Sequence, residues 1–279
     1  MKFGVMMFPT DYSIGPAELA RAVEELGFES LWLPEHTHMP LEHSPWYGGP
    51  ELPRHYSHSL DPFIALAAAA AATSGLRLGT GISLVAQHDP ITLAKEIATL
   101  DQISGGRFLF GIGAGWNREE VANHGVDPRF RWRVLREKVL AMKAIWTQDE
   151  AEYHGRYVDF DPIWSWPKPS QEPHPPIIMG GDGPRALEGL LEYCDAWMPH
   201  PDRTGQTFAE RIAGIQERAA AAGRGRIPVT AFGGDDSQEA IAGYQAAGAE
   251  RFIARFVSAP ADEVLPQIRQ FAEVARSFG

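Results

Sequence analysis

Short, almost wholly apolar runs alternate along the chain with longer segments in which apolar positions recur every three or four residues. A strand buried on both faces is apolar throughout, whereas a helix on a sheet is apolar on one side, so the pattern predicts β-α units with parallel strands. The predicted strands are residues 2–8, 30–34, 76–84, 107–112, 176–179, 195–198, 228–232 and 251–255. The predicted helices are residues 15–26, 61–73, 90–103, 130–146, 183–192, 203–222, 237–247 and 260–278.

Eight β-α pairs in 279 residues predict a (β/α)8 TIM barrel as a single domain over residues 1–279, with a doubly wound open sheet as the second choice. Two segments interrupt the alternation, at residues 35–60 and 153–175, and both are rich in aromatic residues and proline. Long loops in a compact domain are usually functional. We therefore expect both insertions on the C-terminal face of the barrel, as a lid or a pocket wall.

Composition narrows the possible functions. A net charge of −11 argues against a nucleic-acid surface or an anionic membrane patch. No apolar run approaches the roughly 20 residues that cross a bilayer. The single cysteine, Cys194, excludes a disulfide framework and fits a reducing compartment, so we expect a cytoplasmic protein with Cys194 in its core.

Glycines gather where two neighbouring strands end. The third predicted strand carries Gly79 and Gly81, and the fourth ends in Gly111, Gly113 and Gly115. In a parallel barrel the C-terminal ends of the strands are where chemistry occurs. We expect these glycines to leave room for a large flat ligand that lies against the backbone.

A second glycine cluster follows the fifth strand, in the segment IIMGGDGPRA. Gly180 and Gly181 precede a predicted helix start at Gly183 and Pro184, where free N–H groups and the helix dipole favour an anion. The alternative is an ordinary helix cap by Asp182. Two adjacent glycines exceed what a cap requires, so we favour a phosphate site.

Candidate catalytic residues follow the second strand, which ends in Glu35 and His36. A carboxylate beside an imidazole at a strand tip is a plausible acid–base pair, although a solvated loop pair would look the same. The histidines of the following loop could suggest a metal site, but the last strand supplies no further ligand, so we predict no metal. Aromatic residues at predicted loops suggest an aromatic-walled substrate pocket, although aromatics also cover barrel tops. The pocket candidates are Phe8, Trp46, Trp116 and Trp164.

These residues resemble the bacterial luciferase-like monooxygenase superfamily, and within it the branch that uses the deazaflavin coenzyme F420. The resemblance covers nearly the whole chain. It rests on MKFGV, ELGFESLWLPEH, LGTGISLVAQHDPITLAKEIATLDQISGGRFLFGIGAGWN and PPIIMGGDGPRALEGLLEYCDAWMP. The resemblance implies a (β/α)8 barrel with an insertion, a flavin-type cofactor, a small-molecule substrate and a homodimer.

The resemblance also implies roles for individual positions. A non-prolyl cis peptide that supports the ring would fall at Gly81–Ile82, and Glu35 and His36 would lie near the reactive edge of the ring. His36 would exchange the proton, and Glu35 would adjust its tautomer. The residues implied to bind the cofactor are Gly81, Ile82, Gly113, Ala114, Gly115, Asn117, Met179, Gly180, Gly181, Asp182, Gly183 and Pro184.

One position departs from the sugar-phosphate dehydrogenases of this branch, which place a glutamate directly after the glycine of the fourth strand. Trp116 stands there in this chain, and Glu119 and Glu120 fall in the following helix. We therefore expect F420-dependent hydride transfer with an apolar or aromatic substrate rather than a sugar phosphate. The alternatives are a monooxygenase that uses reduced FMN and oxygen, a non-catalytic flavin-binding protein, and a metal-dependent barrel hydrolase.

Overall fold

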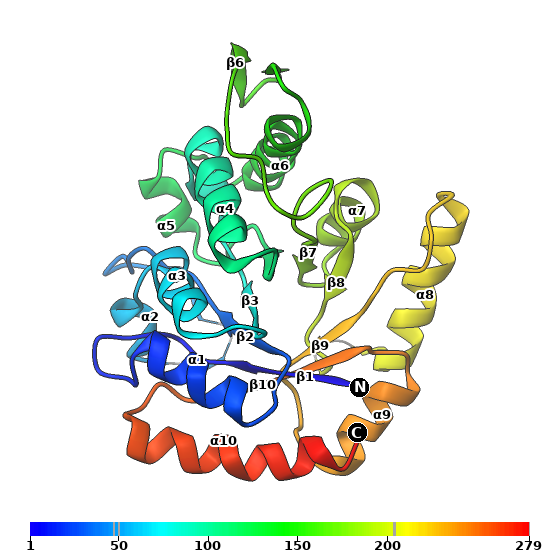
Figure 1. Ribbon diagram of the computed structural model, residues 1–279. Coiled ribbons are helices and arrows are strands. Elements are labelled where there is room, and N and C mark those ends of the chain that lie inside the picture. The colour runs from blue at the N-terminus through cyan, green and yellow to red at the C-terminus, as the bar shows by residue number, and fades with distance from the viewer. Residues whose placement is uncertain (47, 50, 203–204, 279) are drawn as a thin grey trace.

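The eight apolar runs predicted as strands form one parallel sheet in the computed structural model, which describes residues 1–46, 48–49, 51–202 and 205–278. The strand order is β8-β7-β4-β3-β2-β1-β10-β9, and Trp197 of β8 pairs with Val229 just before β9. The two ends of the sheet thus meet, and the helices lie around it (Figure 1), which confirms the (β/α)8 barrel. The barrel strands are β1 (Lys2–Met6), β2 (Ser30–Leu33), β3 (Arg77–Thr80), β4 (Phe108–Ile112), β7 (Ile177–Gly180), β8 (Ala196–Met198), β9 (Thr230–Phe232) and β10 (Arg251–Arg255).

The predicted helices are also present, and local sequence explains several of their ends. The side chain of Asp61 accepts a hydrogen bond from the Ile64 N–H (2.9 Å), and Asp89 caps the next helix in the same way. Gly105 ends that helix with a φ of +67°. The helices are α1 (Pro16–Glu25), α2 (His55–His58), α3 (Pro62–Ala72), η1 (Val85–Gln87), α4 (Pro90–Ser104), α5 (Arg118–Asn123), α6 (Arg131–Thr147), α7 (Pro184–Tyr193), α8 (Phe208–Ala221), α9 (Gln238–Ala246) and α10 (Ala261–Arg276).

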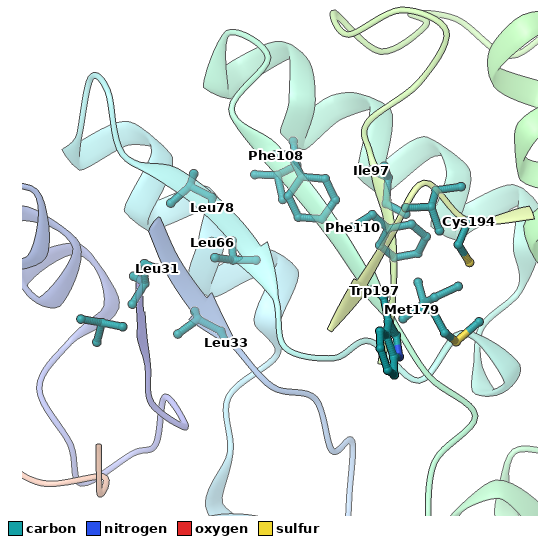
Figure 2. Close-up of a cluster of buried hydrophobic side chains, with 14 of the residues drawn as sticks. Leu31, Leu33, Leu66, Leu78, Ile97, Phe108, Phe110, Met179, Cys194 and Trp197 are labelled. Atoms are coloured by element: carbon teal, nitrogen blue, oxygen red, sulfur yellow. The ribbon is translucent and has the colours of Figure 1, made fainter. Parts of the chain in front are cut away.

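Side chains along each strand alternate between two apolar cores. The outward-facing residues pack against the helices in the larger cluster shown in Figure 2, which includes Cys194 in the buried place expected for it. The inward-facing residues, such as Met6, Trp32 and Ile253, form a smaller cluster inside the barrel. This two-residue period decides which side chains can reach the open end of the barrel.

The insertion at residues 153–175 does not lie where we expected. It follows α6 and leads into the start of β7, so it packs near the N-terminal ends of the strands. Gln171 Nε2 donates to the carbonyl of Phe108, the first residue of β4 (2.8 Å), and Lys168 Nζ donates to carbonyls at the end of α6. The segment begins with an antiparallel hairpin, β5 (Ala151–His154) and β6 (Asp159–Ile163), which projects beyond α6 in Figure 1. The prediction that it walls the catalytic end was wrong, because a connection from a helix to a strand enters the barrel from the opposite face.

The other differences are smaller. β3 stops at Thr80 rather than residue 84, and the peptide bond between Gly81 and Ile82 is cis. The short helices α2 and η1 were not predicted, since each is too short to show a helical period, and α5 was expected only as a helix that holds Glu119 and Glu120, without bounds. The predicted start of α8 at Arg203 lies outside the described residues. None of the helices within the described ranges is long and apolar enough to cross a membrane.

Candidate functional site

A cavity of about 570 Å³ opens at the C-terminal end of the barrel, where the sequence places most of the candidate residues. This volume is within the usual range for sites that bind cofactors and small ligands. The tips of the barrel strands and the first turns of α6 and α7 form its wall. The sequence-predicted residues that line it are Phe8, Glu35, His36, Gly81, Ile82, Gly113, Ala114, Gly115, Trp116, Gly180, Gly181, Asp182 and Gly183.

Ile82 forms part of the cavity wall, and two neighbouring glycines, Gly113 and Gly180, leave room for its side chain. A Cβ on Gly113 would lie 2.0 Å from Ile82 Cδ1, and a Cβ on Gly180 would lie 2.7 Å from Ile82 Cγ2. Gly79 similarly makes room for the ring of Trp32. The space beside Gly79, Gly113 and Gly180 is therefore filled by protein side chains, whereas nothing lies within 4 Å of a Cβ built on Gly181 or Gly183. The cis peptide at Gly81–Ile82 agrees with the expectation from sequence.

The carboxylate that His36 contacts at the cavity is Glu120, not Glu35 as the sequence suggested. His36 Nδ1 lies 2.8 Å from Glu120 Oε2, and the exposed fractions of the two side chains are 6% and 1%. Glu120 belongs to α5, whose first turn is capped by the side chain of Asn117. A carboxylate on Nδ1 fixes the orientation of the ring and its tautomer, and leaves Nε2 as the other exchangeable position.

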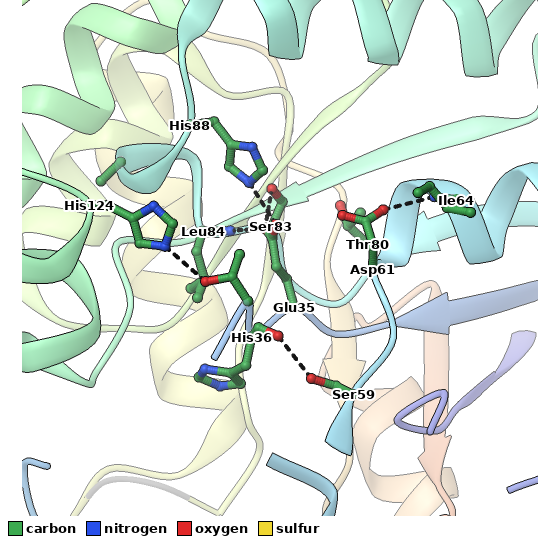
Figure 3. Close-up of polar contacts among 12 residues, drawn as sticks. Glu35, His36, Ser59, Asp61, Ile64, Thr80, Ser83, Leu84, His88 and His124 are labelled. Atoms are coloured by element: carbon green, nitrogen blue, oxygen red, sulfur yellow. Dashed lines mark hydrogen bonds and ion pairs between the residues drawn. The ribbon is translucent and has the colours of Figure 1, made fainter. Parts of the chain in front are cut away.

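Glu35 instead holds the loop that follows β3 (Figure 3). Its carboxylate accepts hydrogen bonds from Ser83 Oγ (2.8 Å) and the Leu84 N–H (2.6 Å), and lies 2.6 Å from His88 Nε2. Burial raises the pKa of Glu35, but the hydrogen bond and charge of His88 and the other donors outweigh it, so the net shift is downward. Burial likewise opposes protonation of His88, yet Glu35 raises the pKa of His88 overall. Each member of this pair thus favours the charged form of the other, with Glu35 buried and His88 half-buried.

Aromatic rings cover the side of the cavity next to His36. The ring of Tyr56 lies 5.0 Å from that of His36, and Trp116 lies 6.0 Å away in an edge-on arrangement. Trp46 packs behind this wall, because its Nε1 donates to the Tyr56 hydroxyl (3.0 Å). The ring of His55 packs against Phe8 and Tyr56, and burial together with the positive charges of Arg255 and His36 lowers the pKa of His55 to about 4.

The opposite side of the cavity is suited to an anion. α7 begins at Pro184, and its N-cap residue Gly183 provides no side-chain cap, so the first N–H groups of the helix stay available. Asp182 does not cap the helix as the alternative required; it pairs with Arg211 (3.1 Å). Arg131 lines the same region, where burial and then the positive charges of two further arginines lower its pKa. Those arginines are Arg118 and Arg185.

Five predicted residues do not line the cavity: Trp46, which packs behind Tyr56, and four others that the fold places elsewhere. Met179 takes an outward position on β7 and packs in the core between sheet and helices. Asn117 is buried as the cap of α5, and Pro184 occupies the first position of α7. Trp164 lies on the distant insertion with 78% of its surface exposed. The prediction that Trp164 lines the pocket is corrected with the placement of that insertion.

Several cavity residues were missed by sequence reasoning. Glu120 was recognised as helical but not as the partner of His36, since 84 residues separate the two. The tips of the last three strands add His200, Phe232 and Arg255. Only their positions at predicted strand ends could have indicated them, because no local motif marks these residues.

Comparisons with known proteins point to one family. The model of the family described as luciferase-like monooxygenase matches residues 12–277. An uncharacterised protein of Mycobacterium tuberculosis is 43% identical over 233 residues, covering 82% of each chain. The FMNH2-dependent dimethylsulfone monooxygenase of Pseudomonas putida is 33% identical, covering 58% of this chain and 45% of its own. The F420-dependent hydroxymycolic acid dehydrogenase of M. tuberculosis is 27% identical, covering 86% of this chain and 64% of its own.

Two solved structures share the fold. The monooxygenase RslO1 from Streptomyces bottropensis has a TM-score of 0.81 at 22% identity, with both chains covered completely. An F420-dependent secondary alcohol dehydrogenase, in complex with an F420-acetone adduct, has a TM-score of 0.76 at 21% identity. The match covers 98% of this chain and 97% of that one. At such identities the likeness establishes the barrel architecture.

Proposed function

The chain belongs to the luciferase-like monooxygenase family, and from that premise we propose that it is a coenzyme F420-dependent oxidoreductase. Characterised relatives are oxidoreductases that use either F420 or reduced FMN, so an oxidoreductase function is supported at that level. The proposed reaction is hydride transfer to or from a small apolar or aromatic substrate. The observation that carries it is the buried His36–Glu120 pair, which places a proton-exchanging imidazole on the wall of the glycine-lined cavity.

The residues present fit a ring-shaped cofactor with an anionic arm. The uncapped start of α7, the glycines before it and Arg131 would hold a phosphate. Ile82 and the segment Gly113–Gly115 would face the ring. When bound, the deazaflavin supplies the hydride donor or acceptor, while the protein supplies binding, orientation and a proton partner.

The chain itself moves the proton that accompanies the hydride. His36 would give a proton from Nε2 to the substrate oxygen, nitrogen or carbon during reduction, and would take one during oxidation of an alcohol. Glu120 holds Nδ1, so that Nε2 remains directed to the reactants. The aromatic wall of Tyr56 and Trp116 excludes water from this side and favours an apolar substrate.

A monooxygenase that uses reduced FMN and oxygen is the second candidate, supported by the dimethylsulfone monooxygenase relative. A non-catalytic flavin-binding protein is the third. The family resemblance also leads us to propose a homodimer located in the cytoplasm, which sedimentation and cell fractionation would test. Equilibrium sedimentation at the mass of one 30.7 kDa chain would reject the dimer.

The decisive experiment is titration of the purified protein with coenzyme F420 and, separately, with FMN, followed by fluorescence. We expect micromolar or tighter binding of F420 and much weaker binding of FMN. The reverse preference, together with substrate-dependent oxygen consumption, would establish the monooxygenase instead. Tight binding without turnover across enones, imines and alcohols would identify a flavin-binding protein.

A further inference from the structure

Two carboxylates and two arginines line the cavity, and neither arginine has an acidic partner among the residues that the structure describes. The two carboxylates are engaged, because Glu35 pairs with His88 and Asp182 pairs with Arg211. Among the described residues, neither Arg131 nor Arg255 lies within 4.0 Å of a carboxylate oxygen. Arg131 stands beside the glycines before α7, where the cofactor phosphate is proposed. Arg255 stands elsewhere, at the tip of β10, and nothing in the proposed function uses it.

The backbone directs Arg255 toward the cavity. Along β10, Phe252 and Ala254 face the helices and Ile253 faces the barrel interior, so Arg255 takes the next inward position. It pairs in register with Met6 of β1, which also lines the cavity. An inward arginine in the last layer of a barrel is therefore a feature of the pocket rim rather than of the outer surface.

A glycine on the neighbouring strand tip makes room for this side chain. Gly233 has a φ of +69°, and a Cβ built on it would lie 2.5 Å from Arg255 Cδ and 3.5 Å from His200 Nε2. The arginine stem thus crosses the tip of β9 directly above Gly233, and His200 approaches the same point from the tip of β8. Both side chains line the cavity, and Phe232 lies between their strands. The result is a basic recess with an apolar wall.

The charge of Arg255 also reaches the side of the cavity where His36 lies. Apart from burial, the positive charge of Arg255 is the largest cause of the lowered pKa of His55. His55 is uncharged at neutral pH, and its ring lies 4.4 Å from that of Phe8. A molecule held against Phe8 and His36 would therefore have the fixed positive charge of Arg255 within reach.

We propose that Arg255, with His200 beside it, binds a carboxylate of the substrate, so that the substrate is an apolar or aromatic acid anion. The guanidinium fork matches the two oxygens of a carboxylate, and such charge-assisted contacts are about twice as strong as neutral ones. The inference rests on the proposed function in one respect: the proposed function places the reacting bond of the substrate next to His36. The phosphate of the cofactor would occupy the separate region at Arg131.

The test compares two ligands of the same shape, trans-cinnamate and its uncharged amide, by calorimetric titration of the full chain. We expect the wild type to bind cinnamate about tenfold more tightly than cinnamamide, or better. Arg255→Gln should remove this preference while leaving cinnamamide affinity and the melting temperature unchanged. Arg255→Lys should keep part of the preference, because the charge stays but the fork is lost.

The matched control is Arg226→Gln, which removes one arginine from an exposed ion pair with Glu250 near the other end of the barrel. This variant should behave as the wild type. The proposal is overturned if the wild type shows no preference, if cinnamate does not bind at millimolar concentration, or if the preference survives in Arg255→Gln. Should Arg255→Gln fail to fold, an undiminished preference in Arg255→Lys would overturn it equally.

Cofactor titrations of the same variants separate this proposal from the proposed function. Arg255→Gln should bind F420 and FMN within about twofold of the wild type. A selective loss of cofactor affinity, with the cinnamate preference retained, would assign Arg255 to the cofactor and refute the substrate role. If the wild type bound neither cofactor but still preferred cinnamate, the proposed function would fail while the carboxylate site stood.

Discussion

Two glutamates near the cavity each hold one histidine, and the two pairs do different work. Glu120 meets His36 on the cavity wall, whereas Glu35 meets His88 inside the loop after β3. Adjacent positions on the second strand suggested that Glu35 and His36 act together. Consecutive residues at a strand end point in different directions, so each side chain finds its partner on another segment.

Replacing Glu120 with Gln should lower turnover by roughly tenfold or more, because the amide no longer fixes the tautomer of His36 and general acid–base contributions are on the order of 10²–10⁴. Cofactor affinity should change little, since Glu120 does not line the cavity. Steady-state kinetics beside cofactor titration would separate the two effects. Glu119→Gln is the matched control, because Glu119 binds Ser44 of the outer loop instead. Equal losses in both variants would contradict a specific role for Glu120.

Replacing His88 with Gln should cost about 1–3 kcal/mol of unfolding free energy, because the buried carboxylate of Glu35 keeps a donor but loses a charge. The raised pKa of His88 means that its contribution is complete below 6.5 and disappears as pH rises through the folded value. The lowered pKa of Glu35 means that its contribution is present above 4.5 and disappears as pH falls through the folded value.

The free-energy difference between wild type and His88→Gln should therefore be largest between pH 4.5 and 6.5. Urea denaturation at a series of pH values measures this directly. A difference that stayed constant from acid to alkaline pH would show that His88 and Glu35 are not paired as ions.

At the scale of elements, the turn after β3 packs against the C-terminal ends of β4 and β7, where Gly113 and Gly180 leave room for Ile82. Gly113→Ala would place a methyl group 2.0 Å from Ile82 Cδ1, and such overpacking costs about 1–3 kcal/mol. The displaced Ile82 should also weaken cofactor binding, because it lines the cavity. The double variant Gly113→Ala/Ile82→Ala should recover stability, measured by urea denaturation. Failure of Ile82→Ala to relieve the loss would mean that another contact is responsible.

The sequence predicted the strands and main helices because their signals are local. Apolar runs, the Asp-Pro starts at Asp61 and Asp89, and the stop at Gly105 all act within a few residues. The sequence also shows that glycines lie at the strand ends. It does not show which side chains pack against them, because Ile82 and Trp32 come from other segments. The contact between His36 and Glu120 could not be predicted for the same reason, because 84 residues separate the two side chains.

At the scale of the whole molecule, the barrel separates its two ends. The cavity lies at one end, while the hairpin of β5 and β6 and the rest of its insertion pack near the other. The sequence shows that residues 153–175 form an insertion but not which face it covers. That choice follows from the order of the neighbouring elements, because the insertion leaves a helix and enters a strand.

Replacing Trp164 with Ser should leave cofactor affinity and turnover within about twofold of the wild type, and stability within about 0.5 kcal/mol, because surface substitutions rarely cost more. Trp164 is exposed, and its indole N–H donates a 3.3 Å hydrogen bond to Glu150. Trp116→Leu, on the cavity wall, should by contrast reduce turnover. Similar losses in the two variants would show that the hairpin reaches an active site after all.

β1 and β10 are paired in the barrel but lie at opposite ends of the sequence, so synthesis produces them at different times. Phe3 faces Phe252 across that seam, and Met6 faces Arg255, so the last strand of the described chain supplies the last cavity residue. At about 5–20 residues per second, a ribosome delivers β10 roughly 10–50 s after β1. Throughout that interval one edge of β1 has no neighbour and the pocket is incomplete. The pocket therefore gains Arg255 and its β1–β10 seam only when nearly all of the 279 residues have been made.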